Sequence, residues 1–441
     1  MKAHLSNAAC GIADYAAYPV GMLVVAPIIL RNLGIEQYGV WAVATAAINA
    51  GSIVASGFGD ANIQHVATQR TGGDFGALQR AVRSTMGIHL LLGSMMATIF
   101  WIAAPYLASR IGQSNPAVQS SCLWCLRIAG LMTFARAIES VCISTQRAFE
   151  RYGAAVRVSV LARLLSLAAA AALTTFGQRV VSILATTAIL TGLGLVLQLV
   201  HLKKLLHANT LLPYFDPQAT NALFKFGIFS WLLATSGVLF SQADKLIGGV
   251  SFGAAAIASY ALCAQMAQPI YGIAASGLHF LFPYISGKRV TASSTTLART
   301  VLLAFTANAA FVLLSTLGIL MFGNRILLLW GGDAISRSGA PLLPIVVWSS
   351  ALLSLNVTGS YAMLALGRVQ AVTWLNLAAG GTMLLLIAWL LPRYGMIGFA
   401  EARLIHGSIT LLIYIPLALY LRPGSLVRLT VSTRVPTGEE A

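Results

Sequence analysis

Charged residues are scarce in this sequence, and acidic residues are the scarcest of them. Only 9% of the 441 residues are charged, with 28 Lys and Arg against 12 Asp and Glu, whereas a soluble domain carries about 25%. Hydrophobic residues make up 58%, and the mean hydropathy is +0.80. Apolar runs long enough to cross hydrocarbon must be helices, because their backbone groups can be satisfied only within the segment. The composition therefore excludes an ordinary soluble enzyme and predicts an all-α integral membrane protein.

Residues that bind metals or carry redox chemistry are also few. The five cysteines all fall in or beside apolar runs: Cys10, Cys122, Cys125, Cys142 and Cys263. No second Cys or His pair accompanies the Cys122-x-x-Cys125 spacing, and the histidines show no ligand spacing. We expect small apolar packing residues here, with no metal site and no cofactor.

Signatures of other function classes are missing as well. The sequence has no G-x-x-x-x-G-K-[ST] motif, which excludes the phosphate-binding loop of an ATPase. Basic residues do not form runs with interleaved aromatics, so nucleic-acid binding is not expected. The longest predicted outward-facing loop, residues 323–339, leaves little room for an external catalytic domain. We therefore predict a secondary transporter and not a membrane-embedded glycosyltransferase, polymerase or ligase.

Twelve apolar segments, separated by turns rich in Gly and Pro, are long enough to be membrane spans. The predicted spans are 10–31, 39–61, 84–109, 117–144, 154–176, 179–202, 223–250, 254–283, 298–322, 340–366, 370–391 and 396–421. The longest loop, roughly residues 203–222, divides six spans from six. This division predicts an N-terminal six-helix lobe over 1–205, a C-terminal lobe over 206–421 and a short cytoplasmic tail over 422–441.

The distribution of Lys and Arg orients these spans. One side of the predicted membrane carries 17 of the 28 basic residues and the other carries 6, with 5 inside spans. Basic residues favour cytoplasmic loops. Both termini lie on the more basic side and are therefore predicted to be cytoplasmic.

The two halves resemble each other faintly. Residues 33–42 can be laid over residues 252–261, and each decamer joins the first two helices of its half. Because each half has an even number of spans, the repeats would be parallel, related by an axis along the membrane normal. This arrangement predicts a central cavity between the two lobes.

We assign ten charged residues to the membrane-spanning part of the chain, where charges are costly and usually face a pathway or a bundle interior. The basic ones are Arg127, Arg136, Arg163, Lys245 and Arg403, and the acidic ones are Asp14, Asp60, Glu139, Asp244 and Glu401. Asp14 and Asp60 lie near span ends, so the deeper charges are mainly positive. This excess suits an anionic cargo, and arginine binds phosphate through two parallel hydrogen bonds.

Helical spacing relates three of these charges on the fourth span. Arg136 and Glu139 are three residues apart, so they share a helix face and can pair. Arg127 lies nine residues before Arg136, which puts it on the opposite face. We therefore expect one of the two arginines to face a cavity, and the other to pack against a neighbouring helix or extend toward the interface.

A second set of charges lies near the predicted outer side. Asp244 is far along the seventh span, and Glu401 and Arg403 enter the twelfth from the same side. We hypothesise an outer charge cluster that joins these two spans. The alternative role for all the intramembrane charges is purely structural ion pairing.

Short motifs lie along nearly the whole chain, at residues 33–41 (LGIEQYGVW), 57–59 (GFG), 146–152 (QRAFERY), 244–248 (DKLIG), 282–283 (FP), 366–368 (LGR) and 392–400 (PRYGMIGFA). They resemble the motifs of bacterial polysaccharide flippases, the O-antigen and exopolysaccharide translocases of the multidrug/oligosaccharidyl-lipid/polysaccharide (MOP) exporter superfamily. Each motif is weak alone, but their order and spacing together are specific.

This resemblance implies two six-helix lobes in the bacterial inner membrane, around a cationic cavity with alternating access. The implied cargo is an undecaprenyl-diphosphate-linked oligosaccharide, with coupling to H⁺ or Na⁺ and with polysaccharide polymerase or export machinery as partners. The candidate substrate-binding residues are Arg136, Arg163, Lys245, Arg403 and Arg127. The candidate ion-coupling residues are Glu139, Asp244 and Glu401.

Three other readings remain. A drug or organic-cation antiporter of the same superfamily would favour acids and aromatics in its cavity, against the positive excess found here. A cell-wall precursor flippase usually has two more helices than the twelve predicted. A scaffold without transport activity is not excluded by the sequence.

Overall fold

The computed structural model describes residues 21–56, 58–72, 75–149, 152–208, 210–288 and 293–421, and within these ranges the regular structure is entirely helical. Nine of the described helices are long and apolar enough to cross a membrane. The first predicted span is described only in part, as the apolar helix Gly21–Leu33. The predicted tail over 422–441 and Asp14 lie outside the described residues.

The first half of the chain forms a bundle that we call the first bundle. Besides Gly21–Leu33, it contains α2 (Ile35–Ser56), α3 (Gly59–Gly72), α4 (Phe75–Gly112), α5 (Pro116–Ala148), α6 (Tyr152–Thr175) and α7 (Val180–Leu205). The helices α4 and α5 extend beyond the predicted spans at both ends, because helical hydrogen bonding continues where the apolar sequence stops. Asn115 caps α5, and its side chain accepts hydrogen bonds from the backbone nitrogens of Ala117 and Val118.

The second half forms the second bundle, whose helices are less cleanly separated. It contains α8 (Pro217–Leu278), α9 (Leu281–Lys288), α10 (Ser294–Gly339), α11 (Leu343–Ala365), α12 (Val369–Thr410), the 3₁₀ turn η1 (Leu411–Ile413) and α13 (Tyr414–Tyr420). Three of these helices bend sharply at a glycine with positive φ: α8 at Gly253, α10 at Gly332 and α12 at Gly395. The bends in α8 and α12 each separate two predicted spans. With these bends counted, the described helices correspond to the twelve predicted spans.

One sequence-based assignment was wrong. The stretch 323–339, predicted as the longest outer loop, is helical in the structure: α10 continues to the bend at Gly332 and then to Gly339. Its sequence includes the apolar run Ile326–Trp330, which favours continuing the helix over leaving it. The segment between the bundles is also shorter than predicted, because α7 ends at Leu205 and α8 begins at Pro217.

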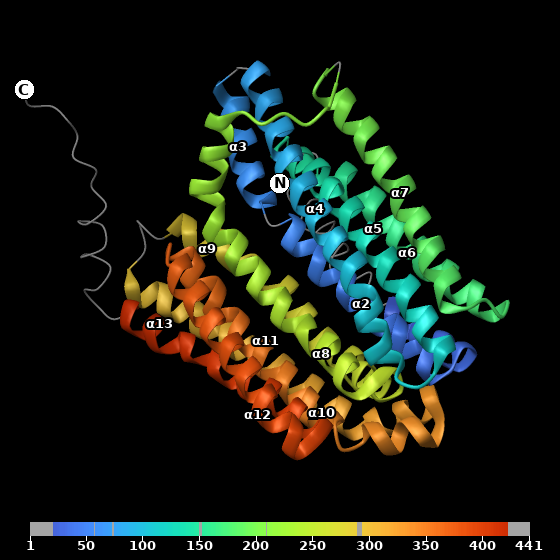
Figure 1. Ribbon diagram of the computed structural model, residues 1–441. Coiled ribbons are helices and arrows are strands. Elements are labelled where there is room, and N and C mark those ends of the chain that lie inside the picture. The colour runs from blue at the N-terminus through green and yellow to red at the C-terminus, as the bar shows by residue number, and fades with distance from the viewer. Residues whose placement is uncertain are drawn as a thin grey trace, which may run out of the picture.

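The two bundles meet along α2 and α8. Figure 1 shows the first bundle in blue and green, the second in yellow to red, and α8 between them. Gly39 of α2 lies directly against the backbone of Ala254, and a Cβ at Gly39 would overlap the Ala254 carbonyl oxygen. The aligned glycines of the two decamers, Gly34 and Gly253, have similar positive φ values of 79° and 83°. The faint internal repeat therefore corresponds to two similar helix joints that pack near each other.

Polar contacts cross between the bundles at this same end, which is the predicted outer end. The Gln113 side chain donates to the Phe252 carbonyl at 3.1 Å, and the Arg31 guanidinium donates to the Leu329 carbonyl. Such contacts between side chains and backbone hold the two bundles together there. In this conformation the predicted outer end is therefore closed.

The segment that connects the bundles lies along α4. Arg83 donates to the Leu212 carbonyl at 2.7 Å, and the Asp216 backbone nitrogen donates to Ser84 at 3.1 Å. Arg80 forms an ion pair with Asp216 at 3.8 Å. These contacts fix the connection to the first bundle, so movement between the bundles would begin near the start of α8.

We predict that Gly39→Val destabilises the protein, because the new side chain would force the backbone of α8 away from α2. Overpacking of this kind costs about 1–3 kcal/mol. Thermal unfolding in detergent should show a lower midpoint for this variant. Gly192→Val is the matched control, because a Cβ at Gly192 meets open space, and it should unfold like the native protein. Equal midpoints for Gly39→Val and the native chain would contradict the close packing of α2 against α8.

Candidate functional site

A pocket lies inside the first bundle, between α2, α5, α6 and α7, with about 700 Å³ of space when the open solvent at its mouth is included. Its lining residues recur at helical spacing on each helix, so one face of every helix is turned toward it. The polar and charged lining residues are Thr45, Asn49, Arg136, Glu139, Ser159, Arg163, Ser166, Thr187 and Thr191. The cavity brings together three charged residues that sequence analysis proposed for the site, from two different helices.

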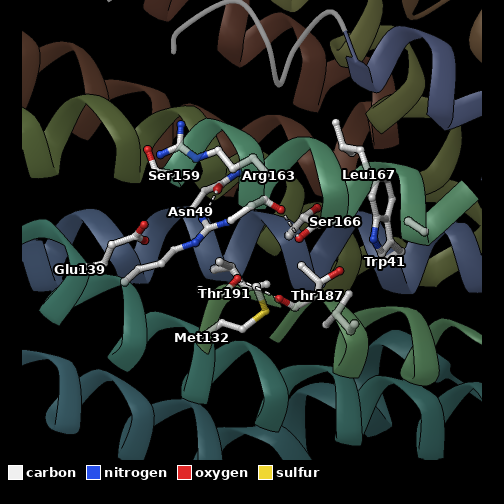
Figure 2. Close-up of a pocket in the computed structure, with 16 residues that line it drawn as sticks. Trp41, Asn49, Met132, Glu139, Ser159, Arg163, Ser166, Leu167, Thr187 and Thr191 are labelled. Carbon is white, nitrogen blue, oxygen red and sulfur yellow. Dashed lines mark hydrogen bonds between the residues drawn. The ribbon is translucent and has the colours of Figure 1, made fainter. Parts of the chain in front are cut away.

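The cavity is charged at one end and uncharged at the other. Figure 2 shows the charged ends of Glu139 and Arg163 on one side, close to Ser159, and Trp41 and Leu167 on the opposite side. Trp41 is the first residue of α2 that lines the cavity, and it lies near the predicted outer end of that helix. On α6, Leu167 lies nearer the predicted outer end than Arg163 does. The charges are therefore displaced toward the predicted cytoplasmic side, and the apolar residues line the part nearer the closed end.

Arg136 is held in place by α2. Its Nη1 donates to the Oδ1 of Asn49 at 3.3 Å, a bond between two helices of the same bundle. Arg136, Arg163 and Glu139 are each half-buried. The lining therefore has two cationic groups and one anionic group, with hydroxyl and amide side chains around them, and its net charge suits an anionic ligand.

None of the uncharged polar lining residues was identified from the sequence. On α6, Ser159, Arg163 and Ser166 lie at spacings of four and three residues, and Thr187 and Thr191 are four apart on α7. Polar residues at helical spacing within an apolar helix could have predicted these lining positions. This pattern alone does not identify a cavity, because Ser and Thr hydroxyls also donate to the backbone of their own helix. Thr187, for example, donates to the Ile183 carbonyl at 3.0 Å.

Arg127 does not line this cavity. Its guanidinium carbon lies 4.6 Å from the ring centroid of Trp101 and 5.3 Å from that of Trp124, on the face of α5 that packs on α4. The expectation that Arg127 and Arg136 face opposite sides of α5 is thus confirmed. Arg127, which was a candidate for the cationic cavity, is not among the residues that line this one, because the rotation of α5 that directs Arg136 inward turns Arg127 outward.

The predicted contact between the seventh and twelfth spans is confirmed. Asp244 on α8 forms an ion pair with Arg403 on α12. The Tyr260 hydroxyl, from beyond the bend in α8, donates to the Asp244 carboxylate at 2.7 Å. The Asp244 side chain is only 1% exposed and that of Arg403 is 14% exposed, so this is a buried pair inside the second bundle. Arg403 therefore does not share a cavity with Arg136.

Glu401 is not part of this cluster. It is four residues from both Ile397 and Ile405, which are exposed on the surface of α12, so it shares their helix face. No ion pair or hydrogen bond of its side chain is present among the described residues. The hypothesis of an outer cluster therefore holds for Asp244 and Arg403 but not for Glu401.

Lys245 lies on the side of α8 that faces the first bundle. Gly249, one turn further on the same face, packs against α2, where its Cβ would lie 2.7 Å from Val43. Within the described residues the Lys245 ammonium forms no ion pair or hydrogen bond. The five expected basic residues thus occupy four places: the cavity, the α8–α12 pair, the α2–α8 contact and the α4–α5 surface.

Comparison with known proteins identifies the family. A sequence profile described as "Polysaccharide biosynthesis protein" matches residues 28–330, more than half of the chain. The chain belongs to this polysaccharide biosynthesis protein family. Its nine described helices of membrane-spanning length and composition make it a multi-pass membrane protein. A comparison with curated proteins found no match.

Solved structures share the fold of this protein. An inward-facing multidrug resistance MATE transporter of the MOP superfamily is 15% identical, with a TM-score of 0.71 over 96% of this chain and 100% of that one. The lipid II flippase MurJ, in an inward closed conformation, is 12% identical, with a TM-score of 0.72 over 98% of this chain and 92% of that one. The MATE transporter VcmN of Vibrio cholerae is 18% identical, with a TM-score of 0.63 over 97% and 98%. The predicted fold class is confirmed.

We predict that removing either partner of the Asp244–Arg403 pair destabilises this protein. Asp244→Asn or Arg403→Gln leaves an uncompensated buried charge, which costs about 3–5 kcal/mol. The charge-swapped double variant, Asp244→Arg with Arg403→Asp, should partly restore the thermal midpoint lost in each single reversal. No restoration would count against a direct interaction.

A surface ion pair provides the control. Asp216→Asn removes the partner of Arg80, whose side chain is 53% exposed. Exposed pairs contribute about 0–1 kcal/mol, so this variant should unfold close to the native midpoint.

Proposed function

We propose that this protein flips an undecaprenyl-diphosphate-linked oligosaccharide from the cytoplasmic to the periplasmic leaflet of the bacterial inner membrane. The oligosaccharide would then enter polysaccharide biosynthesis, as for lipopolysaccharide or exopolysaccharide. The observation that carries this proposal is the cavity of the first bundle, with Arg136 and Arg163 among hydroxyl and amide side chains. Membership of a polysaccharide biosynthesis family supports the same cargo class.

The physical problem for such cargo is its charged headgroup. A diphosphate loses its hydration in hydrocarbon, and burial of unpaired charge is costly. Two half-buried guanidinium groups would replace part of that hydration with paired hydrogen bonds, and the surrounding hydroxyls would bind sugar hydroxyls. The polyprenyl chain can remain in lipid, so the protein needs to shelter only the polar part.

Alternating access would carry the headgroup across. The contacts of Gln113 with Phe252 and of Arg31 with Leu329 close the predicted outer end, while the charged end of the cavity lies toward the predicted inner side. A cargo entering from the cytoplasmic leaflet would meet the arginines first. Breaking the outer contacts and closing the inner end would then expose the headgroup to the periplasm.

Glu139 is our candidate for ion coupling, because it is the acidic residue among those that line the cavity. Protonation of its carboxylate would raise the positive charge of the cavity and would link H⁺ to anion binding. Na⁺ would have a similar electrostatic effect. Asp244 fits this role less well, because it is paired with Arg403 and is buried.

The alternative is an antiporter of drugs or organic cations. The fold is shared with MATE transporters, but identities of 15–18% carry the fold alone. A cavity that takes organic cations needs acidic and aromatic groups. Among the described residues, this cavity is lined by one acidic residue, Glu139, and one aromatic residue, Trp41, but by two basic residues, Arg136 and Arg163. Its net positive charge favours the anionic cargo.

We predict that deleting the gene leaves lipid-linked glycan in the cytoplasmic leaflet and removes surface polysaccharide. The native chain should restore export, whereas Arg136→Ala or Arg163→Ala should reduce it at least tenfold by removing a charge-assisted contact to the headgroup. Arg299→Ala, an exposed arginine outside the cavity, should restore export fully. The measurement is extraction of lipid-linked glycan with assignment of its leaflet. Unchanged glycan export in the deletion strain, with new sensitivity to cationic dyes, would favour the antiporter.

We also predict that cross-linking the outer end stops transport. Gln113→Cys with Phe252→Cys, in a chain whose five native cysteines are replaced, should cross-link with a short thiol reagent and lose glycan export. A cleavable reagent should allow export to recover on reduction. Gln146→Cys with Gln198→Cys is the control, because this hydrogen-bonded pair joins two helices of the first bundle, and its cross-link should leave export intact. Full export with the outer end cross-linked would contradict alternating access at this contact.

A further inference from the structure

Arg127 lies on the lipid-facing side of the first bundle and has no role in the proposed transport path. Trp101 and Trp124, whose rings flank its guanidinium, are 53% and 48% exposed. Nearby on the same two helices, Ile102 and Leu131 are 73% and 62% exposed. These exposed apolar side chains mark a surface that contacts lipid in a membrane-spanning bundle.

An arginine on such a surface is costly unless something polar reaches it. No acidic side chain pairs with Arg127 in the part of the chain that the structure describes. Its Nε is buried and has no hydrogen-bond partner there. The two indole rings stabilise the cation, but they accept none of its N–H groups in a conventional hydrogen bond. The donors of Arg127 therefore have unused capacity.

Arg127 lies in the outer half of the predicted span 117–144, and its side chain points toward the outer end. Side chains on a helix point toward its N-terminus, and α5 begins at Pro116, at the predicted outer end. Arg127 follows Pro116 by about 16 Å at 1.5 Å per residue, and its side chain reaches back toward the level of Trp124. Tryptophans are also enriched at membrane interfaces, because the indole ring has an apolar part and a polar N–H group.

We propose that Arg127, Trp101 and Trp124 form a binding site for the phosphate group of a lipid in the outer leaflet. The indole rings interact with the guanidinium as a cation, whereas phosphate oxygens accept hydrogen bonds in its plane. The two interactions use different parts of the group and can occur together. Phosphate geometry matches the paired N–H donors of arginine, and the indole N–H groups of the two tryptophans are further donors.

The ligand chemistry is a lipid phosphate, and it has two possible sources. One is the phosphodiester of a membrane phospholipid, and the other is a polyprenyl diphosphate. A phospholipid would anchor the first bundle in the outer leaflet while the second bundle moves. If the ligand is a polyprenyl diphosphate, the site would be a second binding site for the lipid carrier, outside the cavity. Only this second source rests on the proposed function.

The test is lipid binding by the purified full-length protein, measured by native mass spectrometry. The native chain, Arg127→Gln and Arg127→Lys are titrated with phosphatidylglycerol, undecaprenyl diphosphate and dioleoylglycerol, which lacks phosphate. Arg127→Gln should weaken the tightest binding of at least one phosphate-bearing lipid about tenfold, and dioleoylglycerol binding should not change. Arg127→Lys should lose less, because it keeps the charge but not the paired donors.

The matched control is Arg393→Gln. Arg393 also lies over a tryptophan, 4.4 Å from the ring centroid of Trp389, but it is exposed and donates to the Trp389 carbonyl at 3.2 Å. This variant should bind all three lipids like the native chain. A loss for phosphatidylglycerol assigns the site to phospholipid, and a loss for undecaprenyl diphosphate alone assigns it to the polyprenyl carrier, even if the cavity variants leave transport unchanged.

Two results would overturn the proposal. The first is unchanged affinity for both phosphate-bearing lipids in folded Arg127→Gln. The second is an equal loss in Arg393→Gln, which would indicate general attraction between basic residues and the membrane surface. Thermal unfolding of each variant establishes that it is folded, and Arg127→Lys serves as the test if Arg127→Gln does not fold.

Discussion

The cost of placing charge in hydrocarbon is the constraint on which the arrangement of this protein depends. Each deep charge is accommodated differently: Arg136 and Arg163 line a polar cavity, Asp244 and Arg403 neutralise each other, and Arg127 lies between two indole rings. The cavity keeps its cations available to a ligand, whereas the buried pair does not. This difference separates the groups suited to bind cargo from those that hold α8 and α12 together.

Close packing of the bundles sets the conformation. The contact of Gly39 with Ala254 allows α2 and α8 to approach backbone to backbone, and the bend at Gly253 begins the second arm of α8 at the same point. Because this contact lies at the predicted outer end, it closes that end. The connection between the bundles is tied to α4 through Arg83, so relative motion would be concentrated in α8.

Much of the fold followed from the sequence, and the failures have physical reasons. Glycine and proline turns located most helix ends to within a few residues, because these residues interrupt helical geometry. Hydropathy failed at residues 323–339, where an apolar helix bends at Gly332 and continues as helix to Gly339. The spacing rule correctly put Arg127 and Arg136 on opposite faces, since it depends only on the helical repeat. It could not tell which face was inward, because that depends on the neighbouring helices.

The sequence by itself determined the class of the molecule: a helical membrane protein of twelve spans with positive charge in its interior. Composition and periodicity decide these properties, since backbone groups in lipid must be satisfied within each segment. The tertiary structure decided which charges meet. Asp244 and Arg403 are far apart in sequence and pair only because α8 packs on α12, and Asn49 reaches Arg136 only because α2 packs on α5. Helix rotation and packing are set by the side chains of all neighbours together, and no single segment encodes them.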